Sequence, residues 1–236
     1  MKTVILAGGQ GTRLAPYTRI FPKPMLPIGD KAILEILLAQ MKYAGVEEAI
    51  LAVGHFSGLM RAFFQDGSHL GLKIRYNYEK EPLGTAGPLS MIEGLDETFF
   101  VANGDVLTTL NLTDLLAFHC QNSAIATIAA HRRTVHIDLG VIRENGDHTI
   151  QDYIEKPDID YLVSMGIYIF EPAVLAYIPY RQRLDFPDLI KKLLAAGERV
   201  CAYPFDGYWQ DLGRPDDYEQ ANIDFERMRA EFLKEE

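Results

Sequence analysis

The fold is decided by one stretch of the sequence, Met1-Lys-Thr-Val-Ile-Leu-Ala-Gly-Gly-Gln-Gly-Thr-Arg-Leu14. Residues 3–7 form a short apolar run rich in β-branched side chains, which is typical of a buried strand. Gly8, Gly9 and Gly11 follow this run directly. Closely spaced glycines permit a tight turn, and the backbone N–H groups of such a turn suit a phosphate chain. We therefore predict a phosphate-binding loop at the end of the first strand.

Two cations lie close to this loop in the sequence. Arg13 follows its last glycine, and Lys23 stands between two prolines that stiffen its backbone. Together they indicate a polyphosphate site, although a tight turn with solvated cations explains each feature alone. Two common phosphate motifs are excluded. A dinucleotide fingerprint needs glycine where Leu14 stands, and a P-loop needs lysine where Thr12 stands.

The loop and a second segment, Phe21-Pro-Lys-Pro-Met-Leu-Pro27, are together similar to the signature of the sugar nucleotidyltransferases, or nucleoside-diphosphate-sugar pyrophosphorylases. The second segment most resembles the mannose-1-phosphate guanylyltransferase branch. The resemblance implies transfer of a nucleotidyl group from an NTP to a sugar-1-phosphate, with release of pyrophosphate. GTP with mannose-1-phosphate or a heptose-1-phosphate is the expected pair. Thymidylyl, uridylyl or cytidylyl transfer to glucose-1-phosphate or another sugar phosphate stays open.

The composition is that of an ordinary globular protein, since 48% of the 236 residues are hydrophobic and 24% are charged. The formal net charge of −10 argues against a nucleic acid partner, because binding to a phosphate backbone needs a broad basic surface. No apolar run approaches the ~20 residues of a membrane span, and the first residues are too short an apolar run for a secretory signal. We expect a cytoplasmic protein without a nucleic acid or membrane partner.

Apolar runs of strand length alternate with helical patterns along the first half of the chain. Strands are expected over 3–7, 49–53, 73–78, 98–102 and 124–130, and helices over 32–44, 57–64 and 113–121. The last of these helices is capped by Asn111 or Thr113. This alternation predicts an α/β protein with a Rossmann-like, mixed but mostly parallel sheet flanked by helices. The resemblance identifies it as the nucleotide-diphospho-sugar transferase fold.

The second half of the chain does not continue this regular alternation of strands and helices. Strands are expected over 137–143, 149–154, 165–170, 200–203 and 208–212, with a helix over 185–196 that Asp185 caps. A last helix begins at Pro215. Its apolar stripe could pack on a partner copy in a homo-oligomer, but packing on its own domain is more typical. We expect a single nucleotidyltransferase domain, with 1–131 as the nucleotide-binding half and 132–236 as a smaller, β-rich sugar-phosphate-binding half with the final helix.

Ligands of parallel sheets lie beyond the carboxyl ends of the strands, so Gly8 and Asp105 should face one crevice. The loop Glu79-Lys-Glu-Pro-Leu-Gly-Thr-Ala-Gly87 follows another strand, and a glycine-rich helix entry is its simplest explanation. The resemblance implies that this loop reads the nucleobase. The expected nucleotide-binding residues are Leu6, Ala7, Gly8, Gly9, Gly11, Thr12, Glu79, Gly84 and Thr85.

Asp105 ends the motif Asn103-Gly-Asp105, where an aspartate can serve as a turn residue or as a Mg²⁺ ligand. The resemblance favours the metal and supplies a second ligand, Asp211, from the pattern Trp-x-Asp-x-Gly-x-Pro at residues 209–215. Mg²⁺ is therefore the expected cofactor. The sequence by itself cannot place these two aspartates side by side.

The sugar-phosphate residues are also taken from the resemblance. Lys156, in Glu155-Lys-Pro157, would otherwise be interpreted as a solvated surface lysine. The expected set is Asn103, Gly140, Glu155, Lys156 and Gly166. In catalysis, Arg13 would bind the β- and γ-phosphates, Lys23 the α-phosphate and Lys156 the attacking phosphate.

Two alternatives from other classes remain. The same fold could serve as an inactive regulatory or binding subunit, but the charged residues of a working site are present. A nicotinamide-dependent oxidoreductase is opposed by the missing fingerprint. The sequence also lacks the zinc-protease and serine-nucleophile spacings, and the repeat extension and isomerase domain of longer relatives. Acetyl transfer and isomerase activity are therefore not expected.

Overall fold

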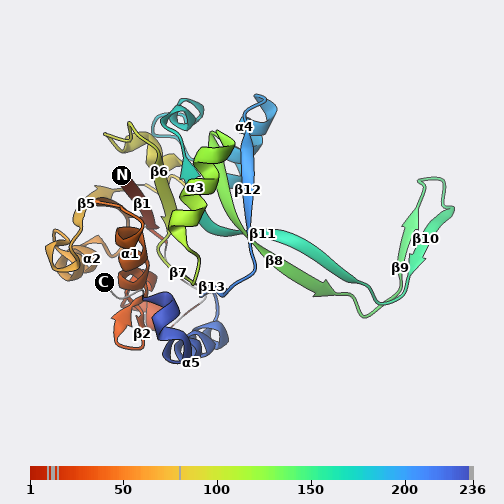
Figure 1. Ribbon diagram of the computed structural model, residues 1–236, viewed down its shortest axis with the longest axis horizontal. Helices are drawn as coiled ribbons and strands as arrows, with labels where there is room; N and C mark the ends of the chain where they lie inside the picture. The colour runs from red at the N-terminus through yellow and green to blue at the C-terminus, as the bar shows by residue number, and fades with distance from the viewer. Residues whose placement is uncertain (10, 12–13, 15, 80, 234–236) are drawn as a thin grey trace.

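The computed structural model describes residues 1–236 except 10, 12–13, 15, 80 and 234–236 (Figure 1). Its centre is a seven-stranded sheet in the order β12-β8-β11-β6-β1-β4-β5. Within the sheet only β11 is antiparallel to its neighbours. The mixed, mostly parallel α/β fold predicted from the sequence is therefore confirmed. The strands are β1 (Lys2–Ala7), β4 (Glu48–Val53), β5 (Lys73–Tyr78), β6 (Phe99–Asn103), β8 (Ala126–His136), β11 (Asp158–Phe170) and β12 (Val200–Phe205).

The central strands are apolar on both faces because helices cover both sides of the sheet. Successive strand residues point to opposite faces, so Val4 and Ile5 enter two different core clusters, both fully buried. Phe99 and Phe100 divide between the same two clusters. The covering elements are the helices α1 (Ile33–Tyr43), α2 (Ser57–Phe64), α3 (Leu112–Asn122) and α4 (Phe186–Ala195), with short 3-10 turns at Tyr17–Arg19, Lys23–Met25, Ser68–Leu70, Gly87–Met91 and Pro172–Tyr177.

Two helix caps predicted from the sequence can be compared with the structure, and one of them is confirmed while the other is wrong. The Asn111 side chain accepts a hydrogen bond from the Thr113 N–H at 3.1 Å, so Asn111 caps α3. Asp185 precedes α4, but its side chain does not cap that helix. Its carboxylate accepts from the Thr85 N–H at 3.0 Å, and the Thr85 hydroxyl accepts from the Phe186 N–H at 2.8 Å. Hydrogen bonds thus join the loop that contains Thr85 to the start of α4.

The last helix, α5 (Pro215–Phe232), packs on its own domain. Phe225 and Phe232 are fully buried in a third cluster with Leu14 and Leu212. A pair of very short strands, β7 (Val106–Thr108) and β13 (Trp209–Asp211), joins the start of this region to the end of β6. A second small pair is formed by β2 (Pro27–Ile28) and β3 (Lys31–Ala32).

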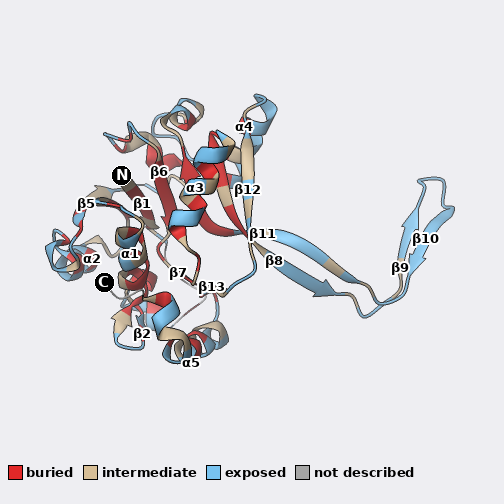
Figure 2. Cartoon of the chain, in the orientation of Figure 1, coloured by how far each residue is buried: buried red, intermediate tan, exposed pale blue. Residues whose placement is uncertain are grey.

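The sheet carries a long projection that we name the arm, residues 131–164. Strands β8 and β11 stay paired beyond the sheet, and the hairpin of β9 (Val141–Glu144) and β10 (Ile150–Ile154) follows (Figure 1). Figure 2 shows the arm exposed along almost its whole length. The sequence predicted strands ending at 130 and beginning at 165, because the polar residues beyond these points gave no buried-strand pattern. Among the described helices, none is both long and apolar enough to cross a membrane.

Candidate active site

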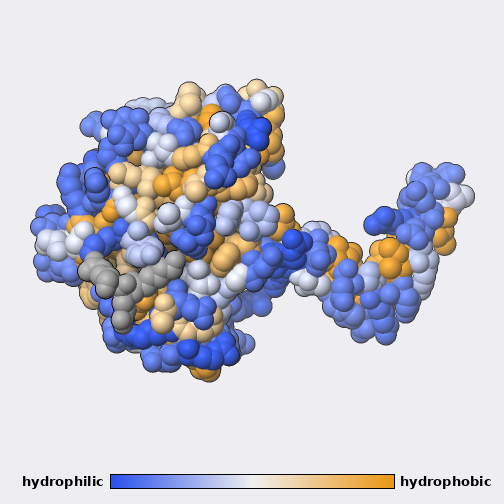
Figure 3. All heavy atoms as spheres, in the orientation of Figure 1, coloured by the Kyte–Doolittle hydropathy of each residue, from blue (hydrophilic) through white to orange (hydrophobic). Residues whose placement is uncertain are grey.

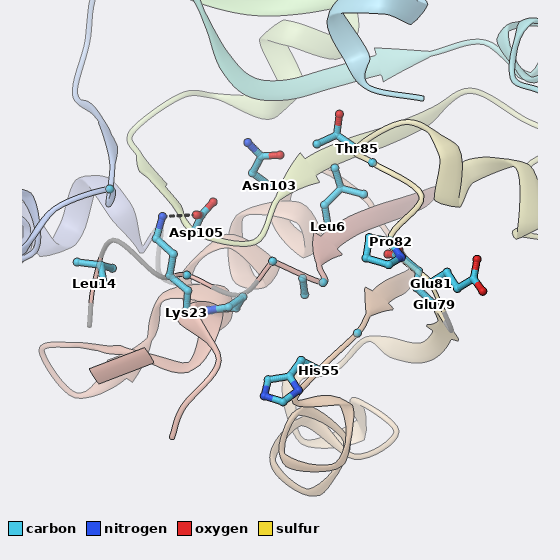
Figure 4. A pocket seen from close by; sticks show the side chains of 18 residues that line it. Leu6, Leu14, Lys23, His55, Glu79, Glu81, Pro82, Thr85, Asn103 and Asp105 are labelled. Carbon is cyan, nitrogen blue, oxygen red and sulfur yellow. Dashed lines mark hydrogen bonds and ion pairs between the residues drawn. The ribbon is translucent and has the colours of Figure 1, made fainter. Parts of the chain in front are cut away.

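A cleft of about 640 Å³ opens at the carboxyl ends of four neighbouring strands. Gly8 follows β1, His55 follows β4 and Glu79 follows β5, while Asp105 comes just after β6. The parallel strands bring these loops to one edge of the sheet, as expected for an α/β fold. Gly8 and Asp105 therefore line one cleft, as the sequence predicted (Figure 4).

Glycines let the backbone close in around this cleft. A Cβ atom on Gly8 would lie 3.1 Å from Oε1 of Glu79, and one on Gly54 would lie 3.2 Å from the Gly8 carbonyl oxygen. A side chain at either position would crowd a neighbouring loop. Of the predicted nucleotide residues, Leu6, Ala7, Gly8, Gly9, Gly11, Glu79, Gly84 and Thr85 line the cleft. Thr12 and the predicted catalytic Arg13 lie outside the described residues.

Lys23 contacts Asp105 on one side of the cleft (Figure 4), and it also lies near Asp211, the second predicted metal ligand. Its ammonium donates a hydrogen bond to Asp105 and lies 3.6 Å from a carboxylate oxygen of Asp211. The Lys23 side chain is only 10% exposed, whereas Asp211 is 50% exposed. Asp211 is brought here by the pairing of β13 with β7, which aligns it with Val106. Two carboxylates distant in the sequence thus share one cation.

These residues fit a divalent cation. Mg²⁺ takes one or two protein carboxylates and completes its shell with water and substrate phosphate. Asp105 and Asp211 converge on one positive group, and both stay partly open to solvent. No group of three acidic, histidine or cysteine residues among the described positions forms an all-protein metal cage. A metal held here would therefore depend on substrate oxygens, which is the usual arrangement for Mg²⁺.

The opposite side of the cleft carries the carboxylate of Glu79 (Figure 4). Burial raises the pKa of Glu79, although the Leu83 N–H donates to its Oε2 at 3.3 Å and favours the ionised form. Thr85 also lines the cleft, but its backbone N–H and hydroxyl are already bound at the start of α4. Thr85 therefore holds the loop in place.

A pH-dependent stability difference follows from the position of Glu79. Its folded-state pKa lies above the unfolded value, so it contributes stability at low pH that is lost as the pH rises through the folded pKa. We expect Glu79→Gln to unfold at a higher temperature than the wild type near pH 8, with the difference vanishing toward the ordinary carboxyl value of 4.5. Thermal unfolding of both proteins across this range measures it.

The control for this experiment is Glu81→Gln, which changes an exposed carboxylate of the same loop. It should leave the unfolding temperature unchanged at each pH. A Glu79→Gln difference that is constant with pH would show that packing, and not the buried charge, is responsible.

Asn103 and Gly166 are brought together, as two of the predicted sugar-phosphate residues. Gly166 has φ = +75°, and a Cβ atom there would lie 2.5 Å from the amide nitrogen of Asn103. Only glycine suits both this backbone conformation and this close approach. Asn103 itself lines the cleft.

The other three predicted sugar-phosphate residues lie elsewhere. Gly140, Glu155 and Lys156 belong to the arm, and none of them lines the cleft. The Lys156 ammonium lies 3.3 Å from Asp138, and the Tyr153 hydroxyl donates to Glu155 at 3.0 Å. Within one chain, these three residues therefore lie apart from Asn103 and Gly166, with which the sequence analysis had grouped them in a sugar-phosphate site.

Comparisons with known proteins identify the family to which this chain belongs. A family model described as nucleotidyl transferase matches residues 2–227. The chain belongs to the nucleotidyl transferase family. A UTP–glucose-1-phosphate uridylyltransferase of Synechocystis sp. is 37% identical over 94% of this chain and 62% of its own length. A mannose-1-phosphate guanylyltransferase of Mycobacterium tuberculosis is 36% identical over 95% of this chain and 64% of its own length. The chain thus spans less than two thirds of these relatives.

Solved structures show the same nucleotidyl transferase fold. HddC from Yersinia pseudotuberculosis superposes with a TM-score of 0.73 at 25% identity, covering 95% of this chain and 99% of its own. A Bacillus anthracis structure in complex with sucrose superposes with a TM-score of 0.77 at 24% identity, covering 94% of both chains. This likeness concerns the fold alone.

Several cleft residues of this nucleotidyl transferase were not predicted from its sequence. They are Leu14, Pro24, Gly54, His55 and Gly213. Gly54 and His55 follow a predicted strand directly, so the rule that placed Gly8 at the carboxyl edge would have found them. Gly213 comes from a distant segment and gave no such signal.

Proposed function

We propose that this protein is a sugar-1-phosphate nucleotidyltransferase that uses Mg²⁺, acting as a single domain over residues 1–236. The observation that carries the proposal is the convergence of Asp105 and Asp211 on Lys23, beside the glycine-rich loop that lines the cleft. Such a cluster suits two anionic reactants, whose mutual repulsion must be neutralised before they can react. The family match and the named relatives support the same reaction class.

In the proposed reaction, an oxygen of the sugar-1-phosphate attacks the α-phosphorus of the NTP. A new P–O bond forms, the bond to the β-phosphate oxygen breaks, and pyrophosphate leaves with that electron pair. The attacking phosphate is already ionised, so no general base is required. Lys23 would neutralise the α-phosphate and Arg13 the leaving phosphates, while Asp105 and Asp211 would hold Mg²⁺. When bound, the metal supplies positive charge to the phosphate oxygens.

The sugar-phosphate would lie on the Asn103 side of the cleft. Asn103 and Gly166 meet there, and a side chain at residue 166 would displace the Asn103 amide. Glu155 would accept hydrogen bonds from sugar hydroxyls and Lys156 would bind the attacking phosphate, with Gly140 beside them. NTP and a sugar-1-phosphate are thus the proposed partners, and the cytoplasm, which holds both pools, is the proposed location.

Guanine is the base that Glu79 fits best. A carboxylate only accepts hydrogen bonds, and guanine is the base whose Watson–Crick edge presents two adjacent donors, N1–H and N2–H. We expect Glu79→Gln to lower the preference for GTP over UTP by roughly 10- to 100-fold, the worth of a good two-bond base contact. Relative kcat/KM values for the two nucleotides measure it. An unchanged preference would remove Glu79 from base recognition.

Pyrophosphate release tests the proposed function directly. The purified protein with Mg²⁺ is assayed against ATP, GTP, CTP, UTP and dTTP, each with mannose-, heptose- and glucose-1-phosphate. Release that requires both an NTP and a sugar-1-phosphate supports the proposal, and the productive pair names the substrates. A folded protein that binds an NTP without turnover across the panel would favour the regulatory subunit. Binding of NAD(H) in place of NTP would favour the oxidoreductase.

A further inference from the structure

The arm is a continuation of the central sheet beyond the edge that carries the cleft. Strand β8 is parallel to the strands that end at the cleft, so its carboxyl end runs outward past the same edge. Residues 130–136 pair continuously with 158–164. At about 3.4 Å per residue this ribbon is roughly 20 Å long, before the β9–β10 hairpin begins.

The ribbon has two unlike faces. Residues directly opposite each other in an antiparallel pair point to the same side. Val135 pairs with Ile159, and Tyr161 and Val163 follow on this side. Their partners in the register are Arg133 and His131, and we name the side that carries these four apolar residues the apolar face. On the other side, Thr134 donates to Asp160 at 2.6 Å and His136 pairs with Asp158 at 2.9 Å. These polar pairs are satisfied within the ribbon, and the same side also carries Leu162, which is 49% exposed.

Among the residues that the structure describes, none covers the apolar face fully, and only Ile159 and Val163 on it are half-buried. Val135 is 42% exposed and Tyr161 is 51% exposed, and in the hairpin beyond, Ile142 and Tyr153 are 55% and 58% exposed. Figure 3 shows hydrophobic residues at intervals along the arm. An isolated two-stranded ribbon is at best marginally stable in water, so this face requires a partner surface.

A second exposed apolar segment adjoins the cleft residues in the sequence. Tyr17, Ile20 and Phe21 are 51%, 66% and 47% exposed. Their segment lies between Leu14 and Lys23, both of which line the cleft. As folded, the chain's own arm projects away from the body of the molecule and does not reach this surface (Figure 1). A second copy can, because its arm is preformed and the contact is satisfied twice around a two-fold axis.

We propose that two copies of this chain exchange arms, so that the arm of one copy covers the cleft of the other and brings Glu155 and Lys156 to its sugar-phosphate side. This inference rests on the proposed function for the roles of those two residues. It accounts for the separation of Lys156 from its own cleft, for the exposed apolar face, and for the exposed apolar residues between Leu14 and Lys23. Each complete site then contains residues of both copies.

Complementation between two inactive variants is the test. Asp105→Asn disables the cleft and Lys156→Ala disables the arm, each expected to lower kcat by ~10²-fold or more. The two chains are co-expressed with different tags, and the assay is pyrophosphate release. A mixed dimer contains one site with an intact cleft and an intact arm. Random pairing therefore restores about one quarter of the wild-type activity per chain, and purified mixed dimers about half.

A second measurement is independent of activity. Tyr161→Asp places a charge on the apolar face, while Leu162→Asp places one on the opposite face of the same strand at nearly the same exposure, 51% against 49%. We expect light scattering to show a dimer for the wild type and Leu162→Asp, and a monomer for Tyr161→Asp. Both residues lie outside the described core clusters, so circular dichroism should be unchanged.

The outcomes separate this proposal from the proposed function. A monomeric wild type, or active wild type with no recovery in purified mixed dimers, would overturn arm exchange. Near-normal turnover of Lys156→Ala would do the same, because the arm would then supply nothing to the site. A dimer that depends on Tyr161 but releases no pyrophosphate with any substrate pair would contradict the proposed function and leave only the interface.

Discussion

Asp105→Asn should lower kcat by ~10²- to 10³-fold while the protein stays folded. Asp105 follows Gly104, whose N–H donates to the Leu6 carbonyl at 3.0 Å, so its carboxylate is fixed at the end of β6. It binds the Lys23 ammonium directly, and a carboxylate oxygen of Asp211 lies 3.6 Å from the same ammonium. Asparagine keeps the size and one acceptor oxygen but removes the charge that a divalent cation needs. The loss is therefore electrostatic, with little change in packing.

Steady-state pyrophosphate release over a Mg²⁺ titration measures the effect. The matched control is Asp188→Asn, an exposed aspartate of α4 that lies 3.6 Å from Lys191 and does not line the cleft. It should leave kcat unchanged. Near-normal turnover of Asp105→Asn at saturating Mg²⁺ would remove Asp105 from the metal site and favour its role as a turn residue.

The cleft could be predicted from the sequence because one rule of parallel sheets was sufficient. Buried strands were identified by their apolar runs, and residues just beyond them had to meet at the carboxyl edge. Gly8, Glu79 and Asp105 are all placed there by local sequence alone. The strand over 73–78 and the helix over 57–64 have the predicted bounds.

The meeting of Asp211 with Asp105 could not be derived in this way. It depends on the pairing of β7 with β13. A strand was predicted over 208–212, where β13 lies, but the three residues of β7 were not predicted as a strand, and neither was the pairing. The resemblance to a known family supplied the pair instead. The hairpin at the end of the arm was predicted, since strands were expected over 137–143 and 149–154. The ribbon of β8 and β11 was not, because polar residues such as Thr134 and Asp160 satisfy each other across it and look like loop residues in a single sequence.

Lys23→Ala is expected to change two properties in opposite directions. The Lys23 ammonium lies near carboxylate oxygens of both Asp105 and Asp211, where a metal bound by both carboxylates would also have to lie. Removing it frees both carboxylates, so Mg²⁺ should bind more tightly in the absence of nucleotide. Turnover should nevertheless fall by ~10²- to 10³-fold, because the positive charge proposed to act on the α-phosphate is gone.

Calorimetric titration of Mg²⁺ and measurement of kcat on the same preparations test both effects. Lys191→Ala, an exposed lysine of α4 paired with Asp188, is the control and should change neither. Weaker Mg²⁺ binding in Lys23→Ala would mean that the lysine organises the carboxylates and does not compete with the metal. Opposite changes would mean that Lys23 keeps the two carboxylates paired until substrate phosphate draws the ammonium away, so that the metal and the nucleotide enter the site together.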